Sequence, residues 1–399
     1  MSRLRELIAE LCPDGVEYRQ LGEVAPFVRE RANTNEARFD AYVGVDALLQ
    51  NKEGRDLTKT GIPSGRHIYF RPGDTLVGNI RPYLKKIWYA DCFGGTNGDV
   101  LVFRSTGKVE AKYLYHVLAS DAFFDYDNGH ARGSKMPRGD KGFIRDYRIP
   151  VPPIEVQREI VRILDSFQEL DNALTAEIEA REKQFEWMLQ EELSISHLNR
   201  VESNTVEMRA VRDVREKVIT PIRAKPADFE GTIPWCKLED VVGYEIGDSL
   251  SGKSVSEETV ASMGLNVYPE GTVLCSCSAT LGVYCVTQKP LVTNQRFMGF
   301  VCSDEILNRF FMYAMDASTT KLLMQATTGT NAYISRKAFE DHLIPVPTIG
   351  VQKRVVEELD SAYHLLNSLR STRETRRKQF AYYRDKLLAF PELNKEVDE

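Results

Sequence analysis

The sequence predicts a mixed α/β fold in which two β-rich domains are connected by two long antiparallel coiled-coil helices, with an internal pseudo-twofold repeat. Three observations predict it. One short phrase occurs twice in the chain, and each copy opens a stretch of about 40 residues with a helical pattern and almost no Gly or Pro. Each copy also follows a segment rich in Gly, aromatic residues and short β-like runs, near 12–148 and 200–343.

The repeated phrase reads IPVPPIEVQ at residues 149–157 and IPVPTIGVQ at residues 344–352. Identical triplets follow at the same offset of about 195 positions, which indicates an internal duplication. The triplets are LDS at 164–166 and 359–361, and KQF at 183–185 and 378–380.

Both helical stretches carry apolar residues mostly at three- and four-residue steps, the pattern of a coiled-coil seam. At 1.5 Å per residue, about 40 residues would span roughly 60 Å. Each seam needs a partner: the other copy packed antiparallel within the molecule, or alternatively the same seam of a second molecule. The predicted packing residues are Ile160, Phe167, Leu174 and Phe185 in the first helix and Leu359, Leu366, Phe380 and Leu387 in the second.

The two β-rich segments resemble one another only faintly. Gly73-Asp74-Thr75-Leu76 corresponds to Glu270-Gly271-Thr272-Val273, and Thr96-Asn97 corresponds to Thr293-Asn294, but the surrounding residues differ almost completely. A shared scaffold with different surfaces is what two domains that read two different targets would show.

The composition is that of a soluble protein with real cores, since 42% of the 399 residues are hydrophobic and 28% are charged. No apolar run approaches the roughly 18–20 residues needed to span a bilayer, so we expect a cytoplasmic protein without a membrane partner. The seven cysteines lack paired CxxC spacing and are expected to be reduced apolar residues, with no metal site. The net charge of −6 argues against a generic nucleic-acid binder, so the local charge distribution must decide.

On these residues the chain resembles the DNA specificity subunits of type I restriction–modification enzymes. The two IPVP phrases and the helices that contain KQF carry the resemblance, together with segments inside both domains. These segments are Leu11–Glu17, Gly78–Lys86, Lys135–Lys141, Ile233–Trp235, Ala279–Gly282 and Thr293–Gln295.

The resemblance implies a non-catalytic subunit that binds double-stranded DNA at a bipartite site and docks two adenine-N6 methyltransferase subunits, with restriction–translocation subunits added for cleavage. S-adenosylmethionine, ATP and Mg²⁺ would bind to these partners, and no cofactor to this chain. We expect a first target-recognition domain at 1–150, a spacer helix at 151–198, a second recognition domain at 199–345, a second spacer helix at 346–392 and a tail at 393–399.

Two basic segments of the first domain suit DNA contacts, because Lys and Arg position phosphates and Arg can pair with guanine. One carries aromatic residues between its cations, and the other lies between Gly129 and Arg148. A solvated basic surface is the alternative interpretation. The candidates are Arg66, Asn79, Arg81, Tyr83, Lys85, Lys86, Arg132, Lys135, Arg138 and Lys141.

The second domain is less basic and richer in hydroxyl and amide side chains. Asn and Gln can pair with adenine, although Ser and Thr in strands often only cap or cross-pair. We expect about half of the named residues to contact DNA, most of them at phosphates. The candidates are Ser276, Ser278, Thr280, Asn294, Gln295, Arg296, Asn331, Tyr333 and Arg336.

Residues 247–254, GDSLSGKS, fit the formula of a phosphate-binding loop. The flanking sequence predicts neither the buried strand nor the long helix that such a loop needs. No methyltransferase or nuclease motif stands out. The rival hypotheses are therefore the recognition subunit of a type IIB-like enzyme, a two-domain protein scaffold and, least favoured, a P-loop ATPase.

Overall fold

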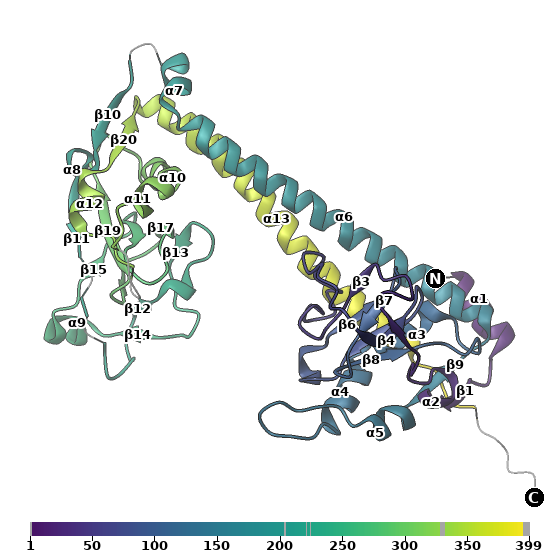
Figure 1. The fold of residues 1–399 in the computed structure, drawn as a ribbon. Coiled ribbons are helices and arrows are strands. Elements are labelled where there is room, and N and C mark those ends of the chain that lie inside the picture. The colour runs from purple at the N-terminus through teal and green to yellow at the C-terminus, as the bar shows by residue number, and fades with distance from the viewer. Residues whose placement is uncertain (1, 203–204, 221, 224, 328–331, 394–399) are drawn as a thin grey trace, which may run out of the picture. The chain divides into compact units, whose positions relative to one another are not determined.

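The structure is a computed structural model that describes residues 2–202, 205–220, 222–223, 225–327 and 332–393. The chain forms two compact units, Met1–Ala176 with Ser371–Glu399 and Glu177–Arg370, and each combines helices with small sheets (Figure 1). The long helices α6 (Ile154–Glu192) and α13 (Ile349–Leu388) each contribute one part to both units. The predicted mixed α/β fold with two β-rich regions and two long helices is confirmed.

The first unit contains a three-stranded sheet in the order β6-β5-β8, a four-stranded sheet in the order β2-β4-β7-β3 and the pair β1-β9. Its strands are β1 (Glu17–Gln20), β2 (Arg31–Asn33), β3 (Ala41–Tyr42), β4 (Arg66–Phe70), β5 (Thr75–Gly78), β6 (Ile87–Tyr89), β7 (Gly94–Thr96), β8 (Val100–Phe103) and β9 (Arg148–Val151). Its shorter helices are α1 (Ser2–Leu11), α2 (Leu21–Val24), α3 (Ala111–Leu118), α4 (Asp121–Gly129) and α5 (Lys141–Asp146).

The second unit contains a five-stranded sheet in the order β11-β19-β16-β17-β13, a four-stranded sheet in the order β14-β12-β18-β15 and the pair β10-β20. Its strands are β10 (Glu207–Ala210), β11 (Arg215–Ile219), β12 (Ile233–Cys236), β13 (Glu245–Ile246), β14 (Ser254–Val255), β15 (Val267–Tyr268), β16 (Val273–Ser276), β17 (Tyr284–Thr287), β18 (Leu291–Thr293), β19 (Phe297–Cys302) and β20 (Leu343–Val346). Its shorter helices are α7 (Ile195–Val201), α8 (Val211–Val214), α9 (Glu257–Met263), α10 (Asn308–Ala317), α11 (Thr319–Leu323) and α12 (Arg336–Asp341).

The repeated IPVP phrase has the same structure in both units. Its first residues form β9 and β20, which pair antiparallel with β1 and β10 in matching registers. The long helices begin directly after the last proline or threonine of each phrase, because the sequence beyond is almost free of Gly and Pro. The glutamine that ends each phrase, Gln157 or Gln352, is buried within the first turns of its helix.

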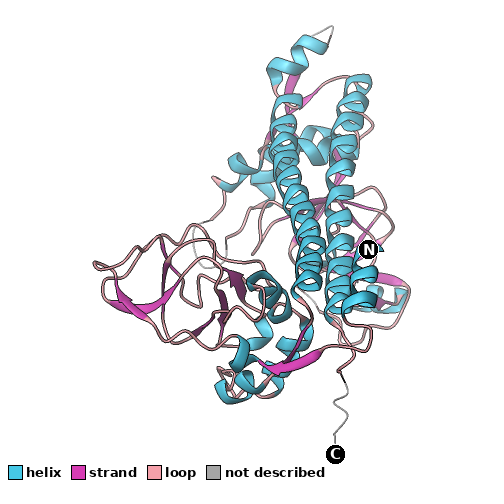
Figure 2. Ribbon diagram, turned by 90° about the vertical axis from the view of Figure 1, so that its right-hand side faces the viewer, coloured by secondary structure: helices cyan, strands magenta, loops and turns pink. Residues whose placement is uncertain are grey.

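The two long helices pack against each other in an antiparallel sense (Figure 2). In the first unit, the ring centre of Phe167 on α6 lies 5.9 Å from the ring centre of Phe380 and 5.7 Å from that of Tyr383 on α13. In the second unit, the ring of Phe185 on α6 lies 5.7 Å from that of Tyr363 on α13. Of the predicted packing residues, Ile160, Phe185, Leu359, Leu366 and Leu387 are buried, and Phe167, Leu174 and Phe380 are partly buried.

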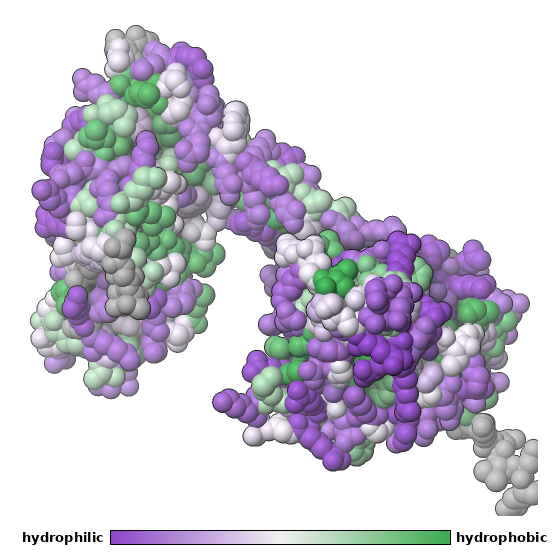
Figure 3. All heavy atoms as spheres, viewed as in Figure 1, coloured by the Kyte–Doolittle hydropathy of each residue, from purple (hydrophilic) through white to green (hydrophobic). Residues whose placement is uncertain are grey.

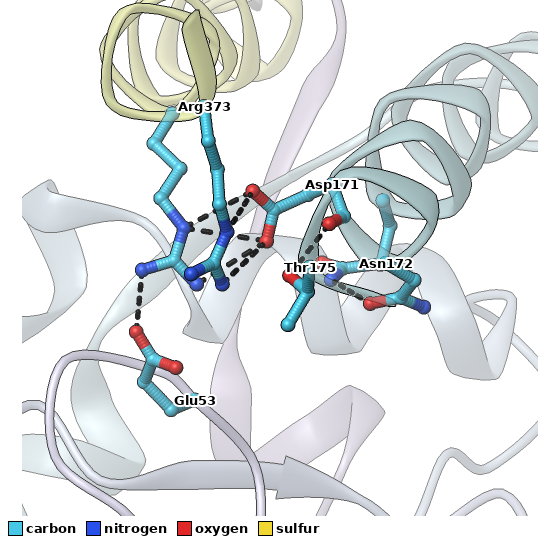
Figure 4. A network of polar contacts seen from close by, with 7 residues as sticks. Glu53, Asp171, Asn172, Thr175 and Arg373 are labelled. Atoms are coloured by element: carbon cyan, nitrogen blue, oxygen red, sulfur yellow. Dashed lines mark hydrogen bonds and ion pairs between the residues drawn. The ribbon is translucent and has the colours of Figure 1, made fainter. Parts of the chain in front are cut away.

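Polar contacts supplement this seam. In the first unit, Asp171 of α6 accepts hydrogen bonds from Arg373 at 3.2 Å and Arg377 at 3.1 Å on α13, and Arg377 also contacts Glu53 (Figure 4). In the second unit, Arg370 donates to Glu182 at 2.5 Å.

Each unit has its own apolar core, built around Phe103, Tyr113 and Phe124 in the first and Phe300, Phe310 and Phe339 in the second. Most of the surface visible in Figure 3 is hydrophilic, with apolar side chains in small groups. Among the described residues, no helix is both long enough and apolar enough to cross a bilayer.

Candidate nucleic-acid interface

The first unit joins two of its basic loops through the backbone. The loop that follows β5, residues 79–86, and the loop before α5, residues 131–139, form a bridge between Ile80 and Arg138. The N–H of Arg81 donates to the carbonyl oxygen of Pro137 at 2.7 Å, and the N–H of Gly139 donates to that of Asn79 at 3.2 Å. The structure therefore brings the loop that carries Arg81 next to the loop that carries Arg132 and Arg138.

The predicted side chains on these loops differ in how freely they could meet a ligand. Arg81, Tyr83 and Lys135 are exposed without a side-chain partner among the described residues. Arg132 pairs with Asp140 at 2.9 Å and Arg138 with Asp99 at 3.2 Å, and both arginine side chains are more than half exposed. Exposed pairs of this kind contribute little to stability, so phosphate or base atoms can replace the carboxylates. Lys141 is exposed at the start of α5.

The remaining candidates of this unit have other positions. Asn79 is 4% exposed, so its amide lies beneath the loop surface. Lys85 donates to Asp121 at 2.5 Å, and Lys86 donates to the carbonyl oxygen of Val45 at 2.7 Å. Arg66 is exposed in β4, which belongs to the other sheet.

The second unit repeats the loop arrangement with different residues. The loop after β16 forms a bridge between Ser278 and Tyr333, which precedes α12. The N–H of Ile334 donates to the carbonyl oxygen of Cys277 at 3.0 Å, and the N–H of Cys277 donates to that of Arg296 at 2.8 Å. These contacts bring three predicted residues, Ser278, Arg296 and Tyr333, into one neighbourhood.

The other candidates of the second unit surround this neighbourhood. Thr280 and Gln295 are exposed, and the side chain of Asn294 accepts a hydrogen bond from the N–H of Arg296 at 3.2 Å. Ser276 is buried and accepts from the N–H of Val283, while Arg336 pairs with Glu340. Asn331 lies outside the described residues.

The two interfaces occupy matching places in the fold. β5 and β16 are each flanked by two antiparallel strands, and the loop after each strand contacts the segment that leads into α5 or α12. That segment ends in a helix cap, Asp140 or Ser335, whose side chain accepts backbone hydrogen bonds. Almost no side chain is shared between the two loops, so the same framework presents two different surfaces.

One element of the first interface has no recognisable signal in the sequence. The turn formed by residues 50–54 lies against the 79–86 loop, because the N–H of Asn51 donates to the carbonyl oxygen of Leu84 and that of Lys52 to Lys85, both at 2.9 Å. The Asn-Lys-Glu-Gly composition favours a turn, but nothing local indicates which loop it contacts.

Each unit attaches α3 or α10 to its long helix at equivalent positions. Gln157 accepts from the N–H of Glu110, before α3, and Gln352 accepts from the N–H of Leu307, before α10, both at 2.8 Å. Farther along the helices, Asp165 pairs with Lys112 of α3, and Asp360 pairs with Arg309 of α10. The duplicated sequence thus encodes a duplicated attachment.

Residues 247–254 do not form a phosphate-binding loop. They connect β13 to β14, a two-residue strand that pairs antiparallel with β12, and no helix begins at Ser254. The ammonium group of Lys253 lies 4.5 Å from the centre of the Phe229 ring. The arrangement lacks the helix N-terminus that would bind a nucleotide phosphate.

The family model for the type I restriction modification DNA specificity domain matches residues 13–181 and again residues 204–376. The chain belongs to this family. It is the DNA specificity subunit of a type I restriction–modification system, and as such the non-catalytic part of the complex. The two matches coincide with the two copies of the repeat, and they exclude a P-loop ATPase as its function.

Relatives and solved structures agree with this assignment. The EcoR124I/EcoR124II specificity subunit of Escherichia coli is 29% identical over 309 residues, which cover 71% of this chain and 72% of the relative. A putative specificity subunit of Haemophilus influenzae is 27% identical over 74% of this chain and 76% of its own length. A solved chain from a study of type I complex assembly has a TM-score of 0.61 at 21% identity, covering 95% of this chain and 98% of its own. The Mycoplasma genitalium S subunit has a TM-score of 0.54 at 14% identity, with 95% and 97% covered, so this specificity subunit shares their fold.

Proposed function

We propose that this specificity subunit reads a bipartite DNA site, one half with each of its two interface loops. The first target-recognition domain, residues 1–150, would read one half-site, and the second, residues 199–345, the other. The helices within 151–198 and 346–392 would set the separation, with 393–399 as a tail. The observation that carries the proposal is the matching place of the 79–86 and 277–283 loops in two frameworks whose exposed side chains differ.

The chemistry of the two loops supports unlike half-sites. The first interface presents Arg81 from the 79–86 loop and Arg132 and Arg138 from the adjoining 131–139 loop, and arginine pairs bidentately with guanine as well as with phosphate. The second presents hydroxyl and amide groups together with two arginines, Arg296 and Arg336, and amides suit adenine. Buried Asn79 and Ser276 would support these loops rather than touch DNA.

The long helices support docking of two identical methyltransferase subunits. Equivalent repeat positions carry exposed apolar side chains: Leu170 is 38% and Leu365 46% exposed, and Trp187 is 64% and Tyr382 61% exposed. Each unit therefore offers one leucine and one aromatic ring to solvent. Exposed apolar side chains at functional positions often belong to protein interfaces. Because the exposed leucine and aromatic ring occur once in each unit, they would provide equivalent docking surfaces for two identical methyltransferase subunits.

In this proposal the partners carry the chemistry. The methyltransferase subunits would bind S-adenosylmethionine and modify adenine N6, and restriction–translocase subunits would use ATP and Mg²⁺. The complex would act in the cytoplasm, where it meets DNA. Among the described residues, no group of three or more His, Cys, Asp or Glu side chains could hold a metal ion.

Selection from a random DNA library tests the proposal. The subunit is purified with its cognate methyltransferase subunits, and bound duplexes are sequenced. We expect two constant blocks separated by a variable gap of fixed length. One continuous block would contradict the bipartite site, and no enrichment would favour the protein-scaffold alternative. A complex with a type IIB-like partner would yield the same blocks but cleave on both sides of them.

A further inference from the structure

The loop after β5 contains a strained turn, residues 81–85, which we name the reading turn. Arg81 and Lys85, which flank its single helical turn, have φ angles of 53° and 49°. Residues other than glycine seldom adopt positive φ, because the Cβ atom then approaches the backbone. A neighbouring turn, residues 50–54, which we name the supporting turn, contains Asn51 and Lys52 with φ angles of 55° and 66°. Such conformations persist only where the surroundings fix them.

These two turns hold four of the five positive-φ non-glycine residues in the part of the chain that the structure describes. The fifth, Ala279, lies in the equivalent loop of the second unit. Positive φ angles therefore concentrate on the two candidate interface loops and on the turn that supports the first of them. Backbone hydrogen bonds of 2.9 Å from Asn51 to Leu84 and from Lys52 to Lys85 join the reading and supporting turns.

A single carboxylate connects both turns through their side chains. Oδ1 of Asp121, the first residue of α4, accepts from Nζ of Lys52 at 2.7 Å and from Nζ of Lys85 at 2.5 Å. Burial raises the pKa of Asp121, but the hydrogen bonds from the two lysines outweigh it and lower the pKa to about 2. The carboxylate is therefore ionised throughout the physiological range.

Two arginines of helix α13 lie next to Asp121 and the supporting turn. Nη2 of Arg384, whose side chain is 4% exposed, lies 3.7 Å from Oδ2 of Asp121. Arg377 contacts Glu53 of the supporting turn at 2.5 Å and is itself fixed by Asp171 of α6. The reading turn is thus tied to the spacer helices by two separate ionic paths.

Among the described residues of the second unit, no carboxylate at the equivalent helix start joins two lysines. The first residue of α11 is Thr319, whose hydroxyl contacts that of Tyr284. The repeat positions that match Arg377 and Arg384 are Glu182, which pairs with Arg370, and the buried Leu189. In the second unit the carboxylate of Asp316 on α10 accepts a hydrogen bond from Tyr244 at 2.6 Å, so a carboxylate held by two lysines is found in the first unit alone among the described residues.

We propose that Asp121 is a positioning residue that, with the supporting turn, holds the reading turn in the conformation that recognises the first half-site. This inference rests on the proposed function. It adds that recognition of one half-site, and not of the other, depends on a carboxylate that does not itself contact DNA.

Charge makes the inference testable, because positioning and simple electrostatics predict opposite results. Asp121→Asn removes a negative charge beside two lysines, which by attraction alone would tighten DNA binding and steepen its salt dependence. Positioning predicts weaker specific binding instead, by roughly five- to one-hundred-fold, with discrimination lost at the first half-site only. Asp121→Glu should retain part of the specific binding and of the discrimination at the first half-site.

The experiment measures binding of the reconstituted complex to duplexes that carry the selected motif with neither, one or the other half-site scrambled. Asp125→Asn is the matched control, because it makes the same charge change one turn along α4 at an exposed carboxylate. Lys52→Met supplies a second variant in case Asp121→Asn fails to fold, and it should lose discrimination at the same half-site.

Unchanged discrimination in both variants would overturn the inference, and so would tighter binding of Asp121→Asn or an equal loss at both half-sites. Failure of the proposed function looks different: the wild-type complex would then not distinguish intact from scrambled half-sites at all.

Discussion

The backbone N–H of Arg81 donates a hydrogen bond to the carbonyl oxygen of Pro137 at 2.7 Å. This contact joins two basic loops that are separate in the sequence into one surface on the first unit. Because Arg138 follows Pro137 directly, the two guanidinium groups extend from neighbouring backbone positions. Recognition of the first half-site should therefore depend on both loops together.

Arg81→Ala and Arg138→Ala should each weaken DNA binding through one half-site only. A lost base contact would cost about 1–3 kcal/mol and relax specificity at that position. A lost phosphate contact would instead reduce the salt slope of binding with little change in sequence preference. Titration of intact and half-scrambled duplexes at several salt concentrations separates these results.

Arg336→Ala provides the matched control in the second unit, because Arg336 is also an exposed arginine paired with a carboxylate. Its loss should leave discrimination at the first half-site unchanged. Equal losses on duplexes with either half-site scrambled would refute the assignment of one interface to one half-site.

Asp127 predicts a pH dependence of stability. This carboxyl is 1% exposed, its oxygens have no hydrogen-bond partner among the described residues, and burial raises its pKa to about 7. Because this pKa exceeds the usual value of 3.8, the folded state retains a proton that the unfolded state releases. The free energy of unfolding should therefore fall as pH rises from about 4 through 7.

Asp127→Asn removes this dependence, because an amide cannot lose the proton. Relative to wild type, the variant should gain stability as pH rises, by at most about 4 kcal/mol above pH 8 and by much less near pH 5. Chemical denaturation at both pH values measures the difference. A gain that is equal at both would show that Asp127 does not titrate in this window.

Gly139→Ala should disturb the contact between the 79–86 and 131–139 loops without changing any charge. A Cβ atom at this position would lie 2.2 Å from Oδ1 of Asp127 on α4 and 2.9 Å from Oδ1 of Asn79, so these buried side chains or the 131–139 loop must shift to admit it. We expect weaker binding at the first half-site and faster hydrogen exchange in residues 79–86. Gly98→Ala, where nothing lies within 4 Å of the added atom, is the control. Wild-type exchange in Gly139→Ala would contradict the close packing.

Gln157→Ala and Gln352→Ala should act as a matched pair. Each glutamine is buried and satisfies a backbone N–H that would otherwise remain unpaired, which costs on the order of 1–3 kcal/mol. Hydrogen exchange should therefore accelerate in α3 for the first variant and in α10 for the second. Similar exchange changes in both helices for either single variant would argue against separate attachments.

Trp187→Ser and Tyr382→Ser should each weaken docking of one methyltransferase subunit, and the double variant should weaken both. Native mass spectrometry of the reconstituted complex reports the stoichiometry. Glu186→Gln, an exposed neighbour on α6, should leave it unchanged. Normal assembly of the double variant would show that these two rings are not part of the docking surface.

The sequence was sufficient for the fold class because its signals are local and repeated. The IPVP phrase marks where each long helix begins, and apolar spacing places residues such as Leu359 and Leu366 on its buried side. Positions such as Leu170 and Leu365 could not be recognised as exposed without knowing which helix face packs inward.

The interface was harder to predict because it depends on contacts between distant segments. Composition indicated the cations of both loops, yet it could not show that Lys85 is engaged by Asp121 or that Asn79 is buried. The supporting turn was missed for the same reason, since Asn51 and Lys52 reach the reading turn only through tertiary hydrogen bonds.

Methylome sequencing after co-expression with the cognate methyltransferase subunits tests the central claim most directly. The account predicts one gapped motif, with two unlike blocks separated by a fixed number of unspecified base pairs and adenine methylation on both strands. In the Arg81→Ala variant, only one block should become degenerate. A short continuous palindrome would contradict the account.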